Sequence, residues 1–313
     1  MKRLLLAAAM AATFIGTQTA HATTIYATSI EGAQIVKVDT VTASVTPVFN
    51  GVAADSLLFD TSGRIIYTAI VLGQVRRYDP VASTDSLLVS GLSTPADMIL
   101  EPGGNSLLVS QFGAGIISRI DLNTNAIASL GSYGGTPEGL AYDSAGRLFA
   151  NLGTRDGGPN KFIAQLDPMS GAILAQSPGL TSLDGLTFDS FTGHLFASSL
   201  FGNQICEYNP SNLVSGPVAC SAANSVPNPD GIAADGLGNI FVAARGDFNI
   251  YQFTTALGAP TAVANVFGLD DLAPVSGLGS NVPEPASGLL VAAGLLGLGA
   301  VRRPKDRLVQ TAD

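Results

Sequence analysis

The sequence predicts an all-β fold, a six-bladed β-propeller, and three observations support this class. A unit of about four short strands recurs five times, and its clearest copy runs from Pro229 to Phe253. Each strand is an apolar run too short for a helix, and Gly, Asp or Asn bounds it, which are strand and turn signals. The unit repeats every 40 to 46 residues, a period typical of propeller blades.

Each copy opens with an acidic residue at the start of its first strand, and a sixth such strand, without followers, begins at Leu269. No basic residue occupies a matching position in the repeats. The opening acids are Asp55, Asp97, Glu138, Asp184, Asp230 and Asp270. A second set of acids lies in the turn after the first strand, where an Asp side chain commonly bonds its own backbone. These turn residues are Asp60, Asp143, Asp189 and Asp235.

The two ends of the repeat region complement each other. The segment from Thr23 to Asn50 contains three strands without an opening acidic strand, whereas 269–275 offers a first strand with none after it. Joining both pieces in one blade removes an open sheet edge, which would otherwise invite aggregation. We therefore expect residues 23–280 to form one domain of six blades, closed by the C-terminal strand.

The first 22 residues have the pattern of a secretory signal peptide. Lys2 and Arg3 precede an apolar stretch from Leu4 to Ile15, and an Ala-His-Ala sequence ends at Ala22. Such a segment is too short to be a spanning helix and is removed on export. The sequence therefore predicts an exported protein.

Residues 281–313 differ in character from the repeats. A Pro283-Glu284-Pro285 motif precedes about sixteen uncharged, mostly small apolar residues, and a basic cluster containing Arg302 and Arg303 follows. The apolar run could form a single helix across a thin membrane, with the basic end held in the cytoplasm.

This tail closely resembles the PEP-CTERM sorting signal, in which the same motif, helix and basic end follow one another in that order. The resemblance implies recognition by exosortase, a membrane transpeptidase of Gram-negative bacteria that also make extracellular polysaccharide. It further implies transient inner-membrane anchoring through the helix, cleavage near the motif, and delivery to the cell surface or extracellular matrix. Polysaccharide or surface proteins would then be the partners.

The repeat itself, P-x-G-[ILV]-A-x-D followed by G-N-[IL]-[FY]-V-A, resembles the NHL and SMP-30/gluconolactonase-like six-bladed propellers. The resemblance spans most of the chain between the two terminal segments. It implies the fold only, because lactonases, lyases, receptors and binding modules share that fold, so function depends on the site.

The six opening acids are candidate metal ligands. In propellers of this type the first strands line the central channel, so the acids would ring one channel mouth. Clustered carboxylates raise one another's pKa, and a hard cation such as calcium, which accepts six to eight oxygen ligands, would relieve the repulsion. The alternative is a wide, hydrated ring that is repeated along with the blade.

Catalysis has less support, and we assign no catalytic residue. SMP-30-like hydrolases hold their metal with acid and amide ligands, whereas these repeats offer acids and no Asn. Streptogramin-lyase-like propellers use a histidine base, but His194 is the one histidine beyond the signal peptide and follows a turn, where we expect it to be exposed. A Ser-His-Asp set would need another histidine.

The loops between the second and third strands should surround the same mouth. They carry mixed aromatic, amide and charged residues, which suit a polar ligand such as a glycan or peptide, although ordinary solvated loops carry such residues as well. The candidate rim residues are Phe112, Arg155, Asn160, Phe201 and Arg245.

Cys206 and Cys220 fall on the third and fourth strands of one blade, where an exported protein could form a disulfide. The alternative is a pair of buried thiols. The segment from Thr23 to Ala286 carries 9 basic and 22 acidic residues, a net charge of −13. Such a charge disfavours nucleic acid and anionic lipid as partners.

Together these observations predict an exported, non-catalytic binding module of the cell surface or matrix, sorted by exosortase. The alternative is a divalent-metal-dependent hydrolase of lactonase type, which would act at the channel mouth.

Overall fold

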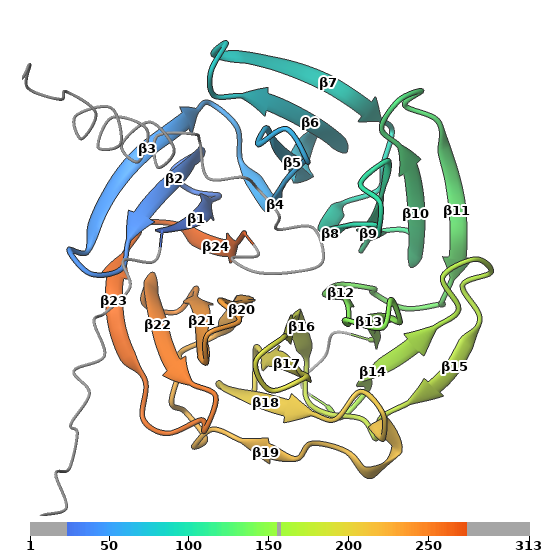
Figure 1. The fold of residues 1–313 in the computed structure, drawn as a ribbon, viewed down its shortest axis with the longest axis vertical. Coiled ribbons are helices and arrows are strands. Elements are labelled where there is room, and N and C mark those ends of the chain that lie inside the picture. Colours follow the sequence, from blue (N-terminus) through green and yellow to red (C-terminus); the bar gives the residue numbers. More distant parts are fainter. Residues whose placement is uncertain (1–23, 155–157, 274–313) are drawn as a thin grey trace, which may run out of the picture.

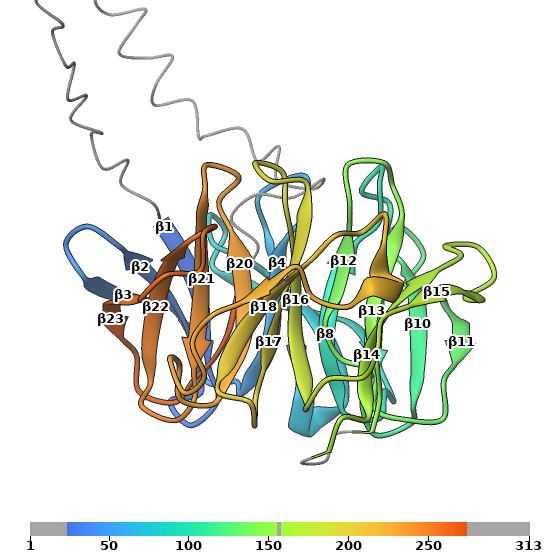
Figure 2. The same ribbon diagram turned by 90° about the horizontal axis from the view of Figure 1, so that it is seen from below.

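The computed structural model describes residues 24–154 and 158–273, and these form a closed ring of six four-stranded antiparallel sheets (Figure 1). The sheets stand around a central axis as the blades of a propeller (Figure 2). In each blade one strand lies beside the axis and the fourth lies at the outer rim (Figure 1). The predicted all-β, six-bladed fold is confirmed.

The blades are numbered from the one that contains the first described residue. Blade 1 contains β24 (Leu269–Leu272), β1 (Thr24–Ser29), β2 (Gln34–Asp39) and β3 (Ser44–Asn50). Blade 2 contains β4 (Ala54–Phe59), β5 (Ile65–Ala69), β6 (Gln74–Asp79) and β7 (Thr84–Ser90). Blade 3 contains β8 (Pro95–Leu100), β9 (Ser106–Gln111), β10 (Ile116–Asp121) and β11 (Ile127–Ser132).

The remaining blades follow the same order from the axis outward. Blade 4 contains β12 (Leu140–Tyr142), β13 (Leu148–Gly153), β14 (Lys161–Leu166) and β15 (Ile173–Gln176). Blade 5 contains β16 (Leu183–Asp189), β17 (His194–Ser199), β18 (Gln204–Tyr208) and β19 (Ala219–Cys220). Blade 6 contains β20 (Pro229–Ala234), β21 (Asn239–Ala244), β22 (Asn249–Thr254) and β23 (Thr261–Asn265). Two short 3₁₀ turns lie in loops, η1 (Ile70–Leu72) and η2 (Leu213–Ser215).

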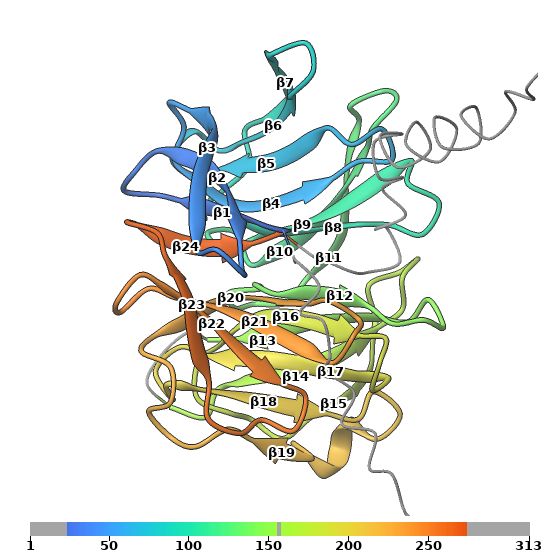
Figure 3. The same ribbon diagram turned by 60° about the vertical axis from the view of Figure 1, so that its left-hand side comes forward.

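Blade 1 joins the two ends of the ring, as the sequence predicted. Its inner strand β24 pairs antiparallel with β1, with Leu272 opposite Ala27 and Leu269 opposite Ser29. Figure 3 shows the two strands side by side. The backbone N–H of Ala273 also donates to the carbonyl of Tyr26 at 2.8 Å. The last described residues therefore close the propeller.

The hydrophobic core is divided among the six interfaces between neighbouring blades. Each interface holds one cluster of buried apolar side chains drawn from both blades. The second strands are the most buried, since blades cover both their faces, and every residue of β5 is buried. The outer strands face solvent, as in β3, where most residues are exposed. Short strands with unbroken apolar runs therefore suit the inner positions of the blade.

The two faces of the ring have different loops. The inner strands all begin at one face, which we call the acidic face, together with the loops between second and third strands. The opposite face, which we call the turn face, holds the tight turns between first and second and between third and fourth strands. The four turn acids take the predicted role, and each accepts at least one backbone N–H of its own turn: Asp60, Asp143, Asp189 and Asp235.

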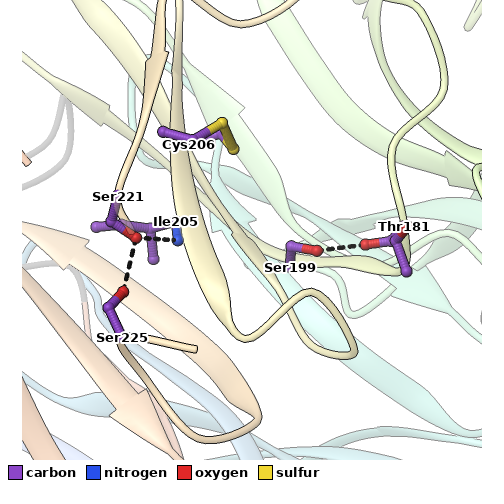
Figure 4. The surroundings of a disulfide bond; sticks show 7 residues. Thr181, Ser199, Ile205, Cys206, Ser221 and Ser225 are labelled. Carbon is purple, nitrogen blue, oxygen red and sulfur yellow. Dashed lines mark hydrogen bonds between the residues drawn. A yellow bond between two sulfur atoms is a disulfide. The ribbon is translucent and has the colours of Figure 1, made fainter. Parts of the chain in front are cut away.

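Cys206 on β18 and Cys220 on β19 lie directly opposite each other, and the structure joins them in a disulfide (Figure 4). Next to the bridge, the hydroxyl of Ser221 accepts the backbone N–H of Ile205 at 3.1 Å. The bridge ties the two-residue outer strand β19 to its blade, where few backbone hydrogen bonds can hold it.

Several predictions fall outside the described residues. These are the signal peptide at 1–22, the tail at 281–313 with its motif and apolar run, and Arg155. Among residues 24–154 and 158–273, no helix is long and apolar enough to span a membrane.

Candidate functional site

The ring encloses a central cavity of about 350 Å³. The inner strands β4, β8, β12, β16, β20 and β24 line it. Figure 1 shows these strands around the central axis. All six opening acids contribute to its wall, which brings residues up to 215 positions apart in the sequence to one site. The acids are Asp55, Asp97, Glu138, Asp184, Asp230 and Asp270, and Asp271 joins them.

The cavity is polar at one end and apolar at the other. The acids lie where the inner strands begin, at the acidic face. Because these strands run in the same direction, their later residues line the opposite end, and these include Phe59, Leu100 and Phe188. Tyr26 packs edge-on against Phe59 there, with ring centroids 4.8 Å apart. The channel can therefore accommodate a ligand with one polar and one apolar part.

In all blades except blade 4, the acids occupy a β-bulge at the start of the inner strand. In blade 2, Ala54 pairs with Ala69 and Leu57 with Tyr67, so that two residues, Asp55 and Ser56, oppose a single one. A bulge of this kind re-aims side chains and is common beside functional sites. The same register shift occurs in the inner strands of blades 1, 3, 5 and 6.

The bulge corrects one part of the sequence alignment. Asp55 is the first residue of its bulge, but Asp97 is the second, and Ala96 occupies the first position in blade 3. Asp271 also occupies a second position, next to Asp270. Sequence reasoning missed Asp271, although the adjacent acids in 269–272 were a visible signal.

A hydroxyl on the second strand stabilises each of several bulges and links it to the next blade. In blade 2, Thr68 accepts the N–H of Ser56 at 2.9 Å and donates to the carbonyl of Ala96 in blade 3 at 3.2 Å. Thr28 links blades 1 and 2 in the same way, through the N–H of Asp271 and the carbonyl of Asp55.

Other blades vary this hydroxyl link. Ser198 accepts the N–H of Gly185 at 2.8 Å and donates to the carbonyl of Asp230 in the next blade. In blade 4 the amide of Asn151 donates to the carbonyl of Asp184 at 2.7 Å. Blade 6 has Ala243 at this position, opposite the bulge of β20. The polar residue recurring in the second strands is thus a structural latch that the sequence analysis did not identify.

Close packing between neighbouring blades explains the glycine of the P-x-G motif. A Cβ atom at Gly231 would overlap Asp271 of the neighbouring inner strand, and Gly139 and Gly185 face the next blade equally closely. Blades 4, 5 and 6 therefore have glycine at the second bulge position, whereas blades 1, 2 and 3 carry a polar side chain there. The channel is consequently asymmetric.

Within the described residues, two basic side chains partner channel acids, although neither occupies a repeat position that matches the acids. Lys161, the first residue of β14, contacts the carboxylate of Glu138, and both side chains are buried. Arg245 lies between two carboxylates, with Nη1 3.1 Å from Asp230 and Nε 3.0 Å from Asp270. Both cations come from the loops or strand ends beyond the second strands, so they do not share a repeat position with the acids.

Asp97 is held instead by uncharged donors. Its Oδ1 accepts the hydroxyl of Ser56 at 3.0 Å and the N–H of Met98 at 2.7 Å. Its Oδ2 accepts the N–H of Leu140 at 2.6 Å. This carboxyl group therefore connects the inner strands of blades 2, 3 and 4.

Four channel carboxyls have raised pKa values. Burial raises the pKa of Asp55 to about 7, against the lowering effect of its hydrogen bond with Asp270. Burial also raises the pKa of Asp97 to about 7, although the N–H groups of Leu140 and Met98 oppose it. Burial and neighbouring acids raise the pKa of Asp270 and of Asp271 well above the usual range. Asp55 and Asp97 can therefore exchange protons near neutral pH.

The charge of Arg245 is secured by the same acids. Its burial lowers the pKa of the guanidinium, but the carboxylates of Asp270 and Asp230 outweigh this and raise it above its usual value. Arg245 therefore stays charged at the channel mouth.

The metal prediction has mixed support from this geometry. The acids share one cavity, but within residues 24–154 and 158–273 no three Asp, Glu, His or Cys groups are arranged to hold a metal ion. Lys161, Arg245 and backbone donors take up several of the carboxylate oxygens that calcium would need. Calcium binding stays a prediction.

The other predicted residues lie away from the cavity wall. Phe112, Asn160 and Phe201 belong to loops at the acidic face, with Asn160 and Phe201 exposed and Phe112 half-buried. His194 lies at the turn face, where its Nδ1 is 2.6 Å from Glu207, so it is half-buried and partnered rather than exposed. It is therefore remote from the channel acids.

Comparison with known proteins agrees with the fold and the tail. Residues 281–303 match the PEP-CTERM protein-sorting motif. No curated protein sequence matches the chain. Among solved structures, the chain is similar to one in a nidogen/laminin complex, with 17% identity, a TM-score of 0.68, and coverage of 81% of this chain and 98% of that one.

Two further structures are similar. One is Kuenenia stuttgartiensis hydrazine synthase, with 15% identity, a TM-score of 0.61 and coverage of 80% and 86% of the two chains. The other is virginiamycin B lyase from Staphylococcus aureus, with 16% identity, a TM-score of 0.54 and coverage of 75% and 83%. At these identities the likeness shows the propeller fold alone. The chain is an exported, exosortase-sorted propeller protein.

Proposed function

We propose that the protein is a non-catalytic binding module of the cell surface or extracellular matrix, and that its ligand enters the acidic end of the channel. The observation that carries this proposal is the composition of the cavity wall. Seven carboxyl groups gather there, and ion pairs from Lys161 and Arg245 engage three of them, Glu138, Asp230 and Asp270. Such a mouth attracts cations and repels anions.

The ligand group that best fits this mouth is an ammonium with an apolar or sugar-like body. An ammonium would donate to carboxylates such as Asp55 and Asp271, whose pKa values are raised by burial and which form no ion pair within the described residues. The apolar end of the cavity would hold the remainder of the ligand. Amino sugars of a polysaccharide and Lys side chains of surface proteins both carry such a group.

A thermal-shift experiment tests this proposal. Glucosamine should raise the melting temperature near neutral pH, whereas glucose, which lacks the ammonium, should not. A ligand at about 100 times its dissociation constant stabilises a folded protein by about 2.7 kcal/mol, which is readily measured. Equal effects of both sugars, or none from either, would remove the ammonium as the recognised group.

The second candidate is a divalent-metal-dependent hydrolase, which the gathering of acids in one cavity favours. It predicts that millimolar calcium raises the melting temperature and that a chelator lowers it. The effect should weaken in Asp184→Asn and Asp230→Asn more than in Asp189→Asn, whose side chain lies in a turn. A melting curve that calcium leaves unchanged would eliminate this candidate.

The sorting motif supports a proposal for the localisation of the protein. We infer that the tail anchors the protein in the inner membrane until exosortase cleaves near Pro283-Glu284-Pro285 and releases the propeller to the surface. Intact-mass measurement of the extracellular protein from its host tests this inference. A mass that still includes residues 287–313 would refute it.

A further inference from the structure

The chain enters and leaves the propeller at the turn face, opposite the acidic mouth. β1 begins there at Thr24, and β24 ends there at Leu272, with Ala273 bonded to Tyr26. Only twelve residues, 274–285, separate the last described residue from the apolar run of the tail. Fully extended, they span about 40 Å at most. While the tail is in the membrane, the propeller therefore stays close to the bilayer.

The turn face carries a set of exposed apolar side chains at the tips of its turns. We call them the turn-tip residues: Val41, Val81, Met169, Phe191 and Leu237. Their exposed fractions range from 56% to 94%. They come from blades 1, 2, 4, 5 and 6, so they are distributed around the ring rather than gathered at one edge.

The turns that present three of these tips share one construction. An aspartate at the start of each turn accepts two backbone N–H groups, from the residues two and three positions later in the chain. The residue two positions later is the turn-tip residue. The aspartates are Asp39, Asp79 and Asp167. This bonding fixes the turn without using the tip side chain. Val41, Val81 and Met169 are thus left in solvent by rigid turns.

The position of the turn face near a bilayer rests on the proposed membrane anchoring of the tail. We propose that, while the tail is anchored, the turn face lies on a bilayer surface rich in phosphatidylethanolamine, with the turn-tip residues in its interfacial layer. The acidic mouth then faces away from the membrane, toward the space where its ligand is found.

The lipid class follows from the charges beside the tips. Asp39 and Asp167 have pKa values lowered by the N–H groups that they accept, so they are ionised at physiological pH. Carboxylates at the contact surface repel anionic headgroups but can meet the ammonium of ethanolamine. Each turn-tip residue contributes little binding free energy alone. Because the anchored tail keeps the propeller near the bilayer, the effective concentration of lipid is high, and weak contacts are enough to orient the turn face.

Exposed apolar side chains also occur at the acidic face, including Val71, which is 81% exposed. What distinguishes the two faces is the point where the chain leaves the propeller. Val71 therefore offers a matched control, because it is a valine as exposed as the turn tips but lies at the opposite face.

The experiment uses the full chain in vesicles of phosphatidylethanolamine and phosphatidylcholine. A fluorophore is attached at Val81→Cys in one sample and at Val71→Cys in the other, while the native cysteines remain in their disulfide. Lipids with brominated acyl chains serve as quenchers, and flotation reports anchoring separately. We expect both proteins to float, with a blue shift and quenching at position 81 and neither at position 71.

Each other outcome contradicts the proposal in a distinct way. Floating protein with equal quenching at both positions, or none, would overturn the orientation but leave the anchoring intact. Failure to float would overturn the anchoring and the orientation together. A blue shift at position 81 that occurs only in membranes containing host proteins would show that a protein, and not lipid, covers the turn face.

Discussion

Lys161 places its ammonium against the carboxylate of Glu138, and the structure buries both side chains at the channel mouth. Lys161 belongs to the third strand of blade 4, and Glu138 precedes the first strand of that blade. A buried lysine is rare unless it is paired. The pair therefore ties the start of β14 to the acidic end of the channel.

Replacing Lys161 by Met should destabilise the fold by about 3–5 kcal/mol, because it breaks a buried ion pair by removing one of its partners. The double variant with Glu138→Gln should recover most of that loss. Chemical denaturation measures both, and Lys37→Met, at an exposed lysine, is the control. If Lys161→Met and Lys37→Met were equally mild, the ion pair would have no structural role.

Closure of the ring by β24 predicts a sharp difference between two truncated chains. A chain that ends after Ala273 keeps the inner strand of blade 1, whereas one that ends after Gly268 loses it and exposes the edge of β1. We expect the first to unfold cooperatively and the second to aggregate or melt broadly. Calorimetry compares them, and indistinguishable melting curves would rule out closure by this strand.

The hydroxyl latch predicts that Ser198→Ala is costly. The substitution leaves the N–H of Gly185 and the carbonyl of Asp230 without their hydrogen bonds to this side chain. A buried polar group left unsatisfied costs about 1–3 kcal/mol. Ser86→Ala, which removes an exposed hydroxyl, should be nearly neutral. Urea denaturation of the two variants measures the difference, and similar losses would contradict the latch.

The channel carboxyls predict an unusual pH dependence. The pKa of Asp55 and of Asp97 is about 7 in the folded protein, against a usual value of 3.8. The folded state therefore binds protons more tightly than the unfolded state, and this stabilisation is complete below the usual value and lost as pH rises through about 7. The melting temperature of the ligand-free protein should fall across this range.

Asp55→Asn mimics the protonated carboxyl and should flatten that decline, while Asp189→Asn, in a turn at the other face, should leave its slope unchanged. Calorimetric scans across the range give the slopes. A melting temperature that rises toward pH 7 in the unsubstituted protein would show that these carboxyls are ionised throughout.

The architecture could be predicted from the sequence because each blade repeats one pattern. The period, the turn acids such as Asp60 and the incomplete terminal pieces all follow from local strand and turn chemistry and from the need to close a ring. The channel acids could be predicted for the same reason, since they lie at the start of equivalent strands.

The details of the site could not be predicted from the sequence, because they depend on contacts between blades. The one-residue offset of Asp97 arises from the bulge, because the sequence does not distinguish the first bulge position from the second. Arg245 reaches Asp270 of blade 1 from blade 6, so no repeat alignment could pair them. The half-buried state of His194 similarly depends on Glu207 of the neighbouring strand.

The most direct test of the proposed function is a calorimetric titration of the intact protein with n-butylammonium and with n-butanol. At about pH 8, above the pKa of Asp55, the proposal predicts saturable binding of the amine and none of the alcohol. Asp55→Asn combined with Asp271→Asn should abolish that binding, and a pH near 5, where Asp55 is protonated, should weaken it. No saturable binding of the amine at the higher pH, or equal binding of amine and alcohol, would contradict a channel mouth built to recognise a cationic group.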